Sequence, residues 1–262
     1  MKNNSSQLLN LAIRAALEAG HILARGFGTL FDISSKPGKH NLVTEYDKLS
    51  EKTIISTLLK EFPNHSFLAE ESGISAPGGP VTWIIDPLDG TVNFAKTIPI
   101  FSVSIAACVG KEVVCGAIYH PITKELFLAE KGKGAYLNGS RLQVTATSSI
   151  EEAFLSTGFP YNVDKNPLHC IEAFASIAKL GSPIRRLGSA AIDLSYVAAG
   201  RFDAFWEVVL EPWDVAAGKL FIEEAGGCVT RYDGSPVDPL VRGPILATNS
   251  HLHAPMLKKL HL

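Results

Sequence analysis

Hydrophobic positions in the first sixty residues recur at the three- and four-residue spacing of amphipathic helices. In the first segment these positions are Leu9, Ala12, Ile13, Ala16, Leu17 and Gly20, with serines ahead of them as candidate caps. In the second segment, from about residue 49 to residue 62, they are Ile54, Ile55, Leu58 and Leu59, and Pro63 follows. The pattern predicts two helices with one buried face each, joined by a loop at residues 34–41.

From Val81 onward the hydrophobic period becomes that of strands. Residues 83–85 form a short apolar run, and alternating apolar positions follow over residues 101–107, 113–119 and 125–129. Asn138-Gly139 is a sequence typical of a hairpin turn. We therefore expect a largely antiparallel sheet in this block.

After about residue 145 short strand-like runs alternate with helical ones. The expected strands cover residues 153–156, 184–186 and 204–206, and the expected helices cover 167–180, 189–199 and 215–225, the last closed by Gly226-Gly227. Such alternation is typical of α/β folds. The chain is therefore predicted as an α/β protein with an N-terminal half at residues 1–145 and a C-terminal α/β half at residues 146–262, which together complete one site.

Composition narrows the possible functions. The 262 residues are 46% hydrophobic and 19% charged, as in a well-packed globular protein, and the formal net charge of -2 gives no signal for nucleic-acid binding. No apolar run is long enough to span a membrane, and the N-terminus lacks the apolar core of a signal peptide. The four cysteines form no C-x-x-C pair. Buried free thiols suit a reducing compartment, so we expect a cytoplasmic protein.

The sharpest candidate for chemistry is Asp-Pro-Leu-Asp-Gly-Thr at residues 86–91. The segment has good turn chemistry and would serve as a plain turn. It also follows a buried strand, where α/β proteins often bind ligands, and burying Asp86 and Asp89 is costly without a cation or hydrogen-bond donors. Pro87 removes a donor and helps to present the Leu88 carbonyl as an oxygen ligand.

Three further acidic positions fit the same chemistry. Asp214 stands where a helix is predicted to begin, so it is either an ordinary N-cap or a ligand. Glu70 lies in an acidic pair typical of a solvated loop, and Asp47 gives the weakest signal. Together these residues offer hard oxygen ligands and no soft ones, which suits Mg²⁺. The amides of Gly90 and Thr91, if they open a helix, could hold phosphate oxygens.

These motifs resemble those of the inositol monophosphatase family in its bacterial form. The first family motif stands at residues 83–94 (WIIDPLDGTVNF) and the second at residues 213–218 (WDVAAG). Residues 70–72 (EES), 44–47 (TEYD), 188–191 (GSAA) and 205–207 (FWE) fall in the expected order, so the resemblance spans nearly the whole chain. It implies a layered αβαβα sandwich of the sugar-phosphatase type.

The resemblance also implies residue roles. One Mg²⁺ would bind Glu70, Asp86 and the Leu88 carbonyl, and a second would bind Asp86, Asp89 and Asp214. Thr91 paired with Asp47, assisted by Glu70, would orient and deprotonate the metal-activated water, and the Gly90 and Thr91 amides would take the phosphate. The pocket for the alcohol part of the substrate would be lined by Gly188, Ser189, Ala190 and Glu207, with Asp89 and Asp214 at its edge. Lys36 would lie in a loop that closes near the metals.

The family resemblance leaves the substrate open. Hydrolysis of myo-inositol monophosphate or a similar small phosphate monoester is the leading expectation, because Val92-Asn93 stands where nucleotide 3′-phosphatases carry Lys-Glu. The alternatives are a sugar bisphosphate, histidinol phosphate or nucleotide phosphatase, and a bacterial RNA-transcription partner on the same fold. A homodimer and inhibition by lithium are also expected from the resemblance.

Overall fold

The computed structural model describes residues 5–35 and 42–260. Its first two helices, α1 (Ser5–Gly26) and α2 (Glu45–Glu61), confirm the two helices expected from the sequence. Helix α2 begins earlier than predicted, because Thr44 caps it. The Thr44 hydroxyl accepts hydrogen bonds from the Tyr46 and Asp47 amides, and the Asp47 carboxylate accepts one from the Thr44 amide at 2.7 Å. This reciprocal cap fixes Asp47 in the first turn of α2.

The expected loop at residues 34–41 is wrong at its start. Strand β1 (Ile33–Ser35) pairs antiparallel with β2 (Leu42–Thr44), which leads directly into α2. A two-stranded pairing across a connection is a non-local contact, and the local hydrophobic pattern did not show it. Lys36 lies outside the described residues.

The first sheet has eight strands in the order β10-β9-β8-β7-β6-β5-β3-β4. The strands are β3 (Ser66–Ala69), β4 (Gly73–Ser75), β5 (Thr82–Asp89), β6 (Ser102–Val109), β7 (Glu112–His120), β8 (Glu125–Glu130), β9 (Gly134–Leu137) and β10 (Ser140–Arg141). All neighbouring pairs are antiparallel except β3 and β5, which confirms the largely antiparallel sheet. Asn138-Gly139 forms the predicted turn between β9 and β10.

The second sheet has five strands in the order β12-β11-β13-β15-β14. They are β11 (Leu155–Thr157), β12 (Ile184–Arg185), β13 (Ala204–Leu210), β14 (Cys228–Thr230) and β15 (Gly243–Thr248). The helices of this half are α4 (Cys170–Ala178), α5 (Ala190–Ala198), α6 (Pro212–Glu224) and α7 (His253–Leu260), and two short 3-10 turns, Val163–Lys165 and Pro167–His169, precede α4. Leu168 and His169 have positive φ, so the helix predicted from residue 167 begins only at Cys170.

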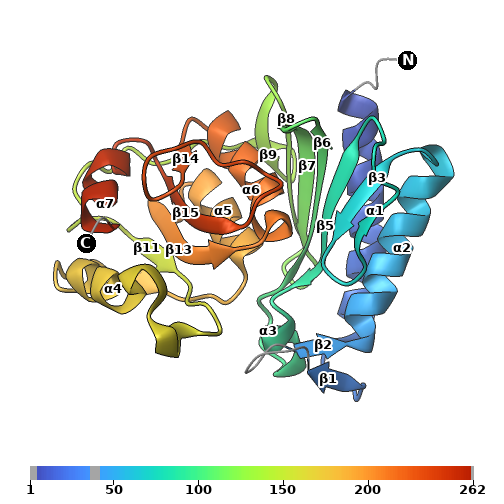
Figure 1. The fold of residues 1–262 in the computed structure, drawn as a ribbon, viewed down its shortest axis with the longest axis horizontal. Coiled ribbons are helices and arrows are strands. Elements are labelled where there is room, and N and C mark those ends of the chain that lie inside the picture. The colour runs from blue at the N-terminus through green and yellow to red at the C-terminus, as the bar shows by residue number, and fades with distance from the viewer. Residues whose placement is uncertain (1–4, 36–41, 261–262) are drawn as a thin grey trace.

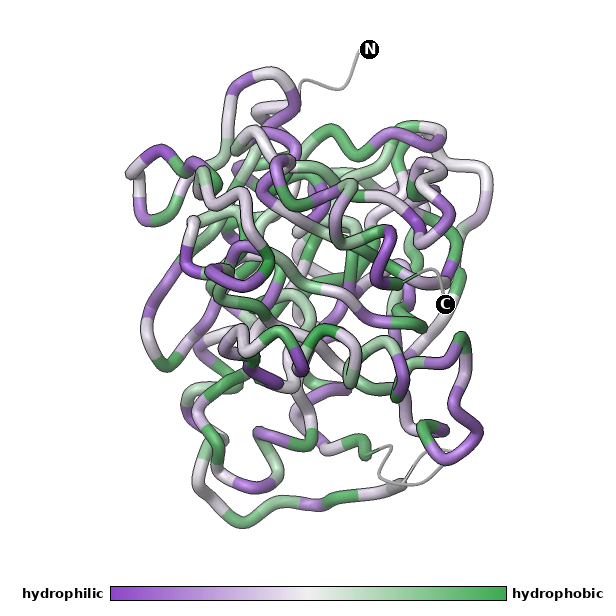
Figure 2. Tube along the Cα trace, turned by 90° about the vertical axis from the view of Figure 1, so that its left-hand side faces the viewer, coloured by the Kyte–Doolittle hydropathy of each residue, from purple (hydrophilic) through white to green (hydrophobic). Residues whose placement is uncertain are grey.

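Five layers follow one another across the molecule (Figure 1). Helices α1 and α2 cover one face of the first sheet, α5 and α6 lie between the two sheets, and α4 and α7 cover the far face of the second sheet. This is the expected αβαβα sandwich. Hydrophobic segments cross the middle of the molecule, while many loops at its edge are hydrophilic (Figure 2). In the described part of the chain no helix is long and apolar enough to cross a membrane.

Small residues allow the central layers to approach closely. A Cβ atom on Gly218 of α6 would lie 2.5 Å from Leu194 Cβ of α5, and a Cβ on Gly116 of β7 would lie 3.0 Å from Ala217 Cβ. The small residues at the start of α6 therefore let this helix pack tightly against both α5 and the first sheet. That packing brings the N-terminus of α6 to the carboxyl end of β5.

Candidate active site

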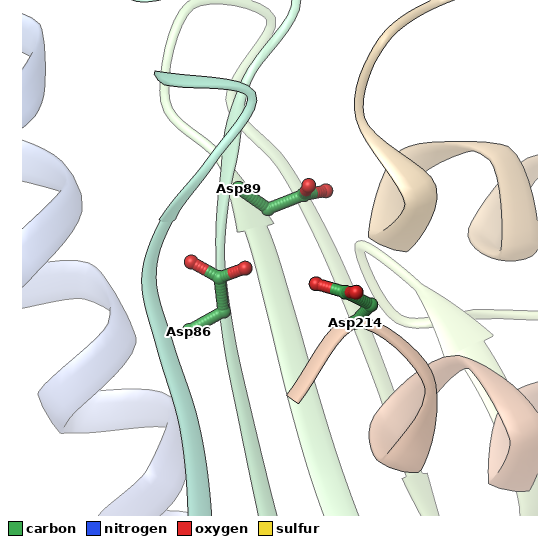
Figure 3. A group of neighbouring side chains, drawn as sticks. All are labelled: Asp86, Asp89 and Asp214. Carbon is green, nitrogen blue, oxygen red and sulfur yellow. The ribbon is translucent and has the colours of Figure 1, made fainter. Parts of the chain in front are cut away.

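Two aspartates end strand β5, as the sequence predicted. Asp86 is 2% exposed and Asp89 is 7% exposed. The pairing of β5 with β6 shifts register between these two residues, and the Asp86 carboxylate accepts a hydrogen bond from the Leu88 amide at 2.9 Å. The irregularity turns both carboxylates toward the layer of α5 and α6 (Figure 3).

Asp214 joins these two aspartates from helix α6. Ligand oxygens of Asp86, Asp89 and Asp214 all lie within 4.8 Å of one another, and Figure 3 shows the three carboxylates facing a common space. The expectation that Asp214 could be an N-cap is corrected in one respect. Glu211 is the N-cap of α6, and Asp214 is the third helical residue, whose carboxylate accepts from the Glu211 amide at 2.8 Å. The Asp214 carboxylate thus stabilises the N-terminus of α6 and also lies beside the carboxylates of Asp86 and Asp89.

The first turn of α5 holds Asp89 in place. One Asp89 oxygen accepts hydrogen bonds from the Ser189 hydroxyl and, at 2.8 Å, from the Ala191 amide. Gly188, just before the cap, has φ of 83°, a conformation that favours glycine. The predicted pocket segment 188–190 therefore lies directly beside Asp89.

Thr91 and Asp47 form a second hydrogen-bonded unit next to the aspartates. Thr91 Oγ1 lies 3.0 Å from Asp47 Oδ1 and 3.0 Å from the Leu88 carbonyl oxygen. Thr91 opens the short helix α3 (Thr91–Ala95) after Gly90, whose φ is 94°. A Cβ on Gly90 would lie 2.9 Å from the Ile100 carbonyl oxygen, so only glycine fits. The Gly90 and Thr91 amides do open a helix, as the proposed phosphate site requires.

Glu70 approaches the aspartates from β3. The parallel ladder pairs Ala69 with Ile85, and the Glu70 amide donates to the Ile85 carbonyl at 3.2 Å. Glu70 therefore follows its strand beside Asp86, although it lies outside the group of three described above. Its charge raises the pKa of Asp47 and Asp86, which shows that it belongs to the same electrostatic site.

Burial raises the pKa of every aspartate in the site. It raises the pKa of Asp47 and of Asp89 to about 6 each. The pKa values of Asp86 and Asp214 lie well above the ordinary value, because burial is reinforced by the neighbouring carboxylates. Such a cluster of buried, mutually repelling oxygen donors fits a divalent cation of the Mg²⁺ type, which would replace the missing solvation.

Glu207 faces the site from β13 in the other half. A Cβ on Gly158 would lie 1.8 Å from Glu207 Oε2, so the glycine makes room for this carboxyl group. Burial raises the pKa of Glu207 to about 8, the Arg186 charge lowers it, and the Asp89 charge raises it. Glu207 therefore lies near Asp89 and within the reach of Arg186.

Three polar residues support the site in structural roles that were not assigned to them from the sequence. Ser50 donates to the Pro87 carbonyl at 2.7 Å and holds the turn at residues 86–91 against α2. The Asn93 side chain donates to the Ile100 and Leu187 carbonyls at 2.8 and 2.9 Å, and so ties α3 to the segment before α5. Thr44 fixes Asp47. Only Thr44, three residues before an acid, gave a recognisable signal, that of a capping box.

We expect Mg²⁺ to raise the melting temperature more at pH 8 than at pH 5. In the metal-free protein, the raised pKa values of Asp47 and Asp89 mean that stability from these groups is present below pH 3.8 and is lost as pH rises through about 6. Mg²⁺ restores this stability at high pH, where protons no longer compete with the metal ion for the carboxylates. A concentration of 100 times the dissociation constant adds about 2.7 kcal/mol. Scanning calorimetry measures the shift, with Na⁺ at equal ionic strength as the control. An equal shift at both pH values would contradict this account.

Comparison with known proteins agrees with the fold and shows the family. A family model described as "Inositol monophosphatase family" matches residues 4–262. The chain is 40% identical over 252 residues to "Nus factor SuhB" of Escherichia coli K12, covering 95% of this chain and 94% of the relative. It is 43% identical over 252 residues to "Inositol-1-monophosphatase" of Caulobacter vibrioides, covering 95% and 98%.

Solved structures show the same architecture. The extragenic suppressor protein suhB from Bartonella henselae matches with a TM-score of 0.90 and 38% identity, covering 97% of this chain and 98% of that one. An "IMPase/NADP phosphatase complexed with Mg2+ and phosphate" matches with a TM-score of 0.84 and 26% identity, covering 97% and 95%.

Fold and site together define a Mg²⁺-dependent phosphatase of the αβαβα sandwich class. The chain belongs to the inositol monophosphatase family.

Proposed function

We propose that this protein hydrolyses a small phosphate monoester and that myo-inositol monophosphate is its preferred substrate. The observation that carries the proposal is the position of three clustered aspartates beside the hydrogen-bonded pair of Thr91 and Asp47. The relative from Caulobacter vibrioides, named an inositol-1-monophosphatase, supports the choice of substrate.

The metal ligands of the proposal come from the ends of two strands, β3 and β5, and from one helix, α6. Glu70, Asp86 and the Leu88 carbonyl would hold one Mg²⁺, and Asp86, Asp89 and Asp214 would hold a second. When bound, Mg²⁺ supplies positive charge that lowers the pKa of water and stabilises the phosphate and leaving oxygens. The hydrogen bonds from Ser189 and Ala191 to Asp89, and from the Glu211 amide to Asp214, orient these carboxylates in advance.

Thr91 and Asp47 would move the proton of the attacking water. Asp47 Oδ2 is occupied by the Thr44 amide and hydroxyl, at 2.7 and 2.5 Å, which leaves Oδ1 for Thr91. When the Thr91 hydroxyl donates to Asp47, its oxygen can accept a proton from water. With its pKa at about 6, Asp47 is ionised and ready to accept above that pH.

The substrate would lie between the two halves. The Gly90 and Thr91 amides at the start of α3 would donate to phosphate oxygens. Gly188, Ser189, Ala190 and Glu207 would line the space for the alcohol, with Asp89 and Asp214 at its edge. Because the first four belong to the C-terminal half, substrate choice and metal binding reside largely on different sides of the site.

The substrate is tested by phosphate release from a panel of compounds with Mg²⁺ present. We expect kcat/KM to be higher for myo-inositol 1-phosphate than for sugar bisphosphates, histidinol phosphate or nucleotide 3′-phosphates. A higher value for one of the latter would keep the phosphatase assignment and overturn the substrate.

Glu207→Gln should change selectivity rather than chemistry. Above pH 8, where Glu207 is ionised, its carboxylate accepts hydrogen bonds from sugar hydroxyls better than an amide does. At such a pH the variant should lose roughly tenfold in kcat/KM for myo-inositol 1-phosphate relative to glycerol phosphate. Steady-state kinetics on both substrates measure the ratio. Glu152→Gln, at an exposed position before β11, is the control and should leave the ratio unchanged. An equal loss on both substrates would show that Glu207 supports the metals or the fold.

A second candidate function is favoured by the relatives named "Nus factor SuhB", which are 40% identical to this chain. On this hypothesis the protein is a partner in transcription, and binding rather than catalysis is the main role. Rescue of a deletion strain by a metal-site variant without phosphatase activity would favour this function. Failure of the inactive variant to rescue would favour catalysis.

The sequence also predicts a homodimer, a cytoplasmic location, inhibition by lithium and a division of the chain at residues 145 and 146. These remain parts of the proposal. Sheet one ends at Arg141 and sheet two begins at Leu155, so the proposed division falls between the two sheets.

A further inference from the structure

A buried serine faces the aspartate cluster from the strand next to β5. The ladder between β5 and β6 pairs Asp89 with Ser102 and Asp86 with Ser104. Residues directly opposite each other in an antiparallel pair point to the same face of the sheet, with Cβ atoms about 4.5–5.5 Å apart. Ser102 is fully buried, and nothing in the mechanism above uses it.

The register shift between Asp86 and Asp89 places both aspartates on the face that these serines occupy. In a regular strand, residues three apart point to opposite faces, but here three steps along β5 are matched by two steps along β6. The preceding pair of the ladder, Ile84 and Ala106, packs in the core that contains α5 and α6. The two serines therefore lie on the face of the sheet that carries the three-aspartate cluster (Figure 3).

The two serine hydroxyls differ in their partners. Ser104 donates to the Trp213 carbonyl of α6 at 3.2 Å, so its hydroxyl is already used to hold that helix against the sheet. The Ser102 hydroxyl has no hydrogen-bond partner among the residues that the structure describes. Leaving a buried hydroxyl unpaired costs about 1–3 kcal/mol, so its presence beside a metal ligand calls for a role.

Asp89 is the carboxylate that Ser102 faces. The Ser189 hydroxyl and the Ala191 amide both donate to its Oδ2 atom. Burial raises the pKa of Asp89 to about 6, and four donors lower it: the Ser189 hydroxyl, the amides of residues 191 and 190, and the Ser102 hydroxyl. Because a serine hydroxyl can rotate to suit an acceptor, Ser102 can turn its proton toward this carboxylate.

We propose that Ser102 is a positioning residue for the second Mg²⁺, because its hydroxyl donates to Asp89 and holds this carboxylate in the orientation that binds the ion. Ser189 and Ala191 hold the carboxylate from α5, and Ser102 holds it from β6, so the side chain is fixed from two layers. Donors behind a ligating group typically contribute about 10- to 100-fold to metal affinity. Ser102 itself touches neither ion nor substrate. The inference rests on the proposed role of Asp89 as a metal ligand.

The first test measures Mg²⁺ affinity without any turnover, by titration calorimetry with Mg²⁺ alone. We expect Ser102→Ala to weaken binding about tenfold. Ser102→Cys fills nearly the same space with a weak donor and should weaken binding to a similar extent. Wild-type affinity in either variant would overturn the proposal, in the cysteine variant because side-chain volume and not the hydroxyl would then be what matters.

Ser156→Ala is the matched control. Ser156 of β11 is as fully buried as Ser102, and its hydroxyl also has no partner among the described residues, but it lies in the second sheet. Its removal should leave Mg²⁺ affinity unchanged. A loss equal to that of Ser102→Ala would mean that any buried hydroxyl has the same effect, and would overturn the proposal.

The second test is a double-mutant cycle with Asp214→Asn, which removes another proposed ligand of the same ion. Once the second Mg²⁺ is lost, the remaining one is held by ligands that Ser102 does not contact. Ser102→Ala should therefore change the remaining Mg²⁺ affinity by less than about twofold in that background. A tenfold loss in both backgrounds would show that Ser102 acts through general packing, and would overturn the proposal.

The third test separates metal binding from chemistry. In Ser102→Ala the Mg²⁺ concentration that gives half-maximal rate should rise about tenfold, while kcat at saturating Mg²⁺ stays within about twofold of the wild type. An unchanged half-maximal concentration with a lower kcat would contradict a positioning role through the ion.

Failure of the proposed function and failure of the inference give different results. Absence of phosphate release from every substrate in the presence of Mg²⁺ would refute the function, whereas calorimetry would still decide whether Ser102 supports the bound ion. Phosphate release together with an unchanged Mg²⁺ affinity in Ser102→Ala would keep the function and refute the inference.

Discussion

Asp214→Asn should lower kcat by about a thousandfold and leave the metal-free protein at least as stable as the wild type. The asparagine oxygen can still accept the hydrogen bond from the Glu211 amide, so the start of α6 is preserved. A neutral amide is a poor ligand for a hard cation, and losing roughly 4 kcal/mol of transition-state stabilisation is about a thousandfold. The variant also removes one of three carboxylates that repel one another.

Measurement of kcat at saturating Mg²⁺ and of the metal-free melting temperature separates the two roles of Asp214. Asp238→Asn provides the matched control. Asp238 pairs with Lys111 at the turn between β6 and β7, at the opposite end of β6 from the partner of Asp89, so its kcat should stay near that of the wild type. Near-normal kcat in Asp214→Asn would leave Asp214 as a helix-capping residue only and the proposed second metal without its ligand.

Thr91→Val should lower kcat by about 100- to 10,000-fold, because it removes the hydroxyl group that links Asp47 to the attacking water. Valine has nearly the same shape as threonine and its main-chain amide remains, so phosphate binding through residues 90 and 91 should persist. Single-turnover kinetics distinguish a slower chemical step from weaker substrate binding.

Thr91→Ser is the matched variant, since it keeps the hydroxyl and removes only a methyl group. It should retain most of the wild-type kcat, whereas Thr91→Val should not. If the two variants lost activity equally, the Thr91 side chain would be acting through packing, and the proposed path of the proton through Asp47 would be wrong.

The main elements of the fold could be predicted because each carries a clear local pattern. The hydrophobic spacing of α1 and the alternation in β6 are sequence features that depend on nearby residues only. The start of α2 was placed too late, because its first turn is polar and is specified by the Thr44 and Asp47 cap. The pairing of β1 with β2 was missed because it depends on a contact between two separate segments, which a local sequence pattern does not show.

The candidate site could be predicted only in part. Asp86 and Asp89 follow an apolar strand, so their burial was foreseeable, and the family motifs pointed to Asp214. The sequence could not show how the packing of α5 and α6 places their side chains beside Asp86 and Asp89. The hydrogen bond from Ser189 to Asp89 depends on the packing of α5 against both sheets.

The most direct test of the central claim is phosphate release from myo-inositol 1-phosphate, measured with Mg²⁺ and again after the metal is removed with EDTA. We predict turnover with Mg²⁺, loss of nearly all of it in EDTA, and recovery when Mg²⁺ is restored in excess. The physical reason is that Asp86, Asp89 and Asp214 can work together only around a cation that offsets their repulsion. Full turnover in EDTA would contradict the account.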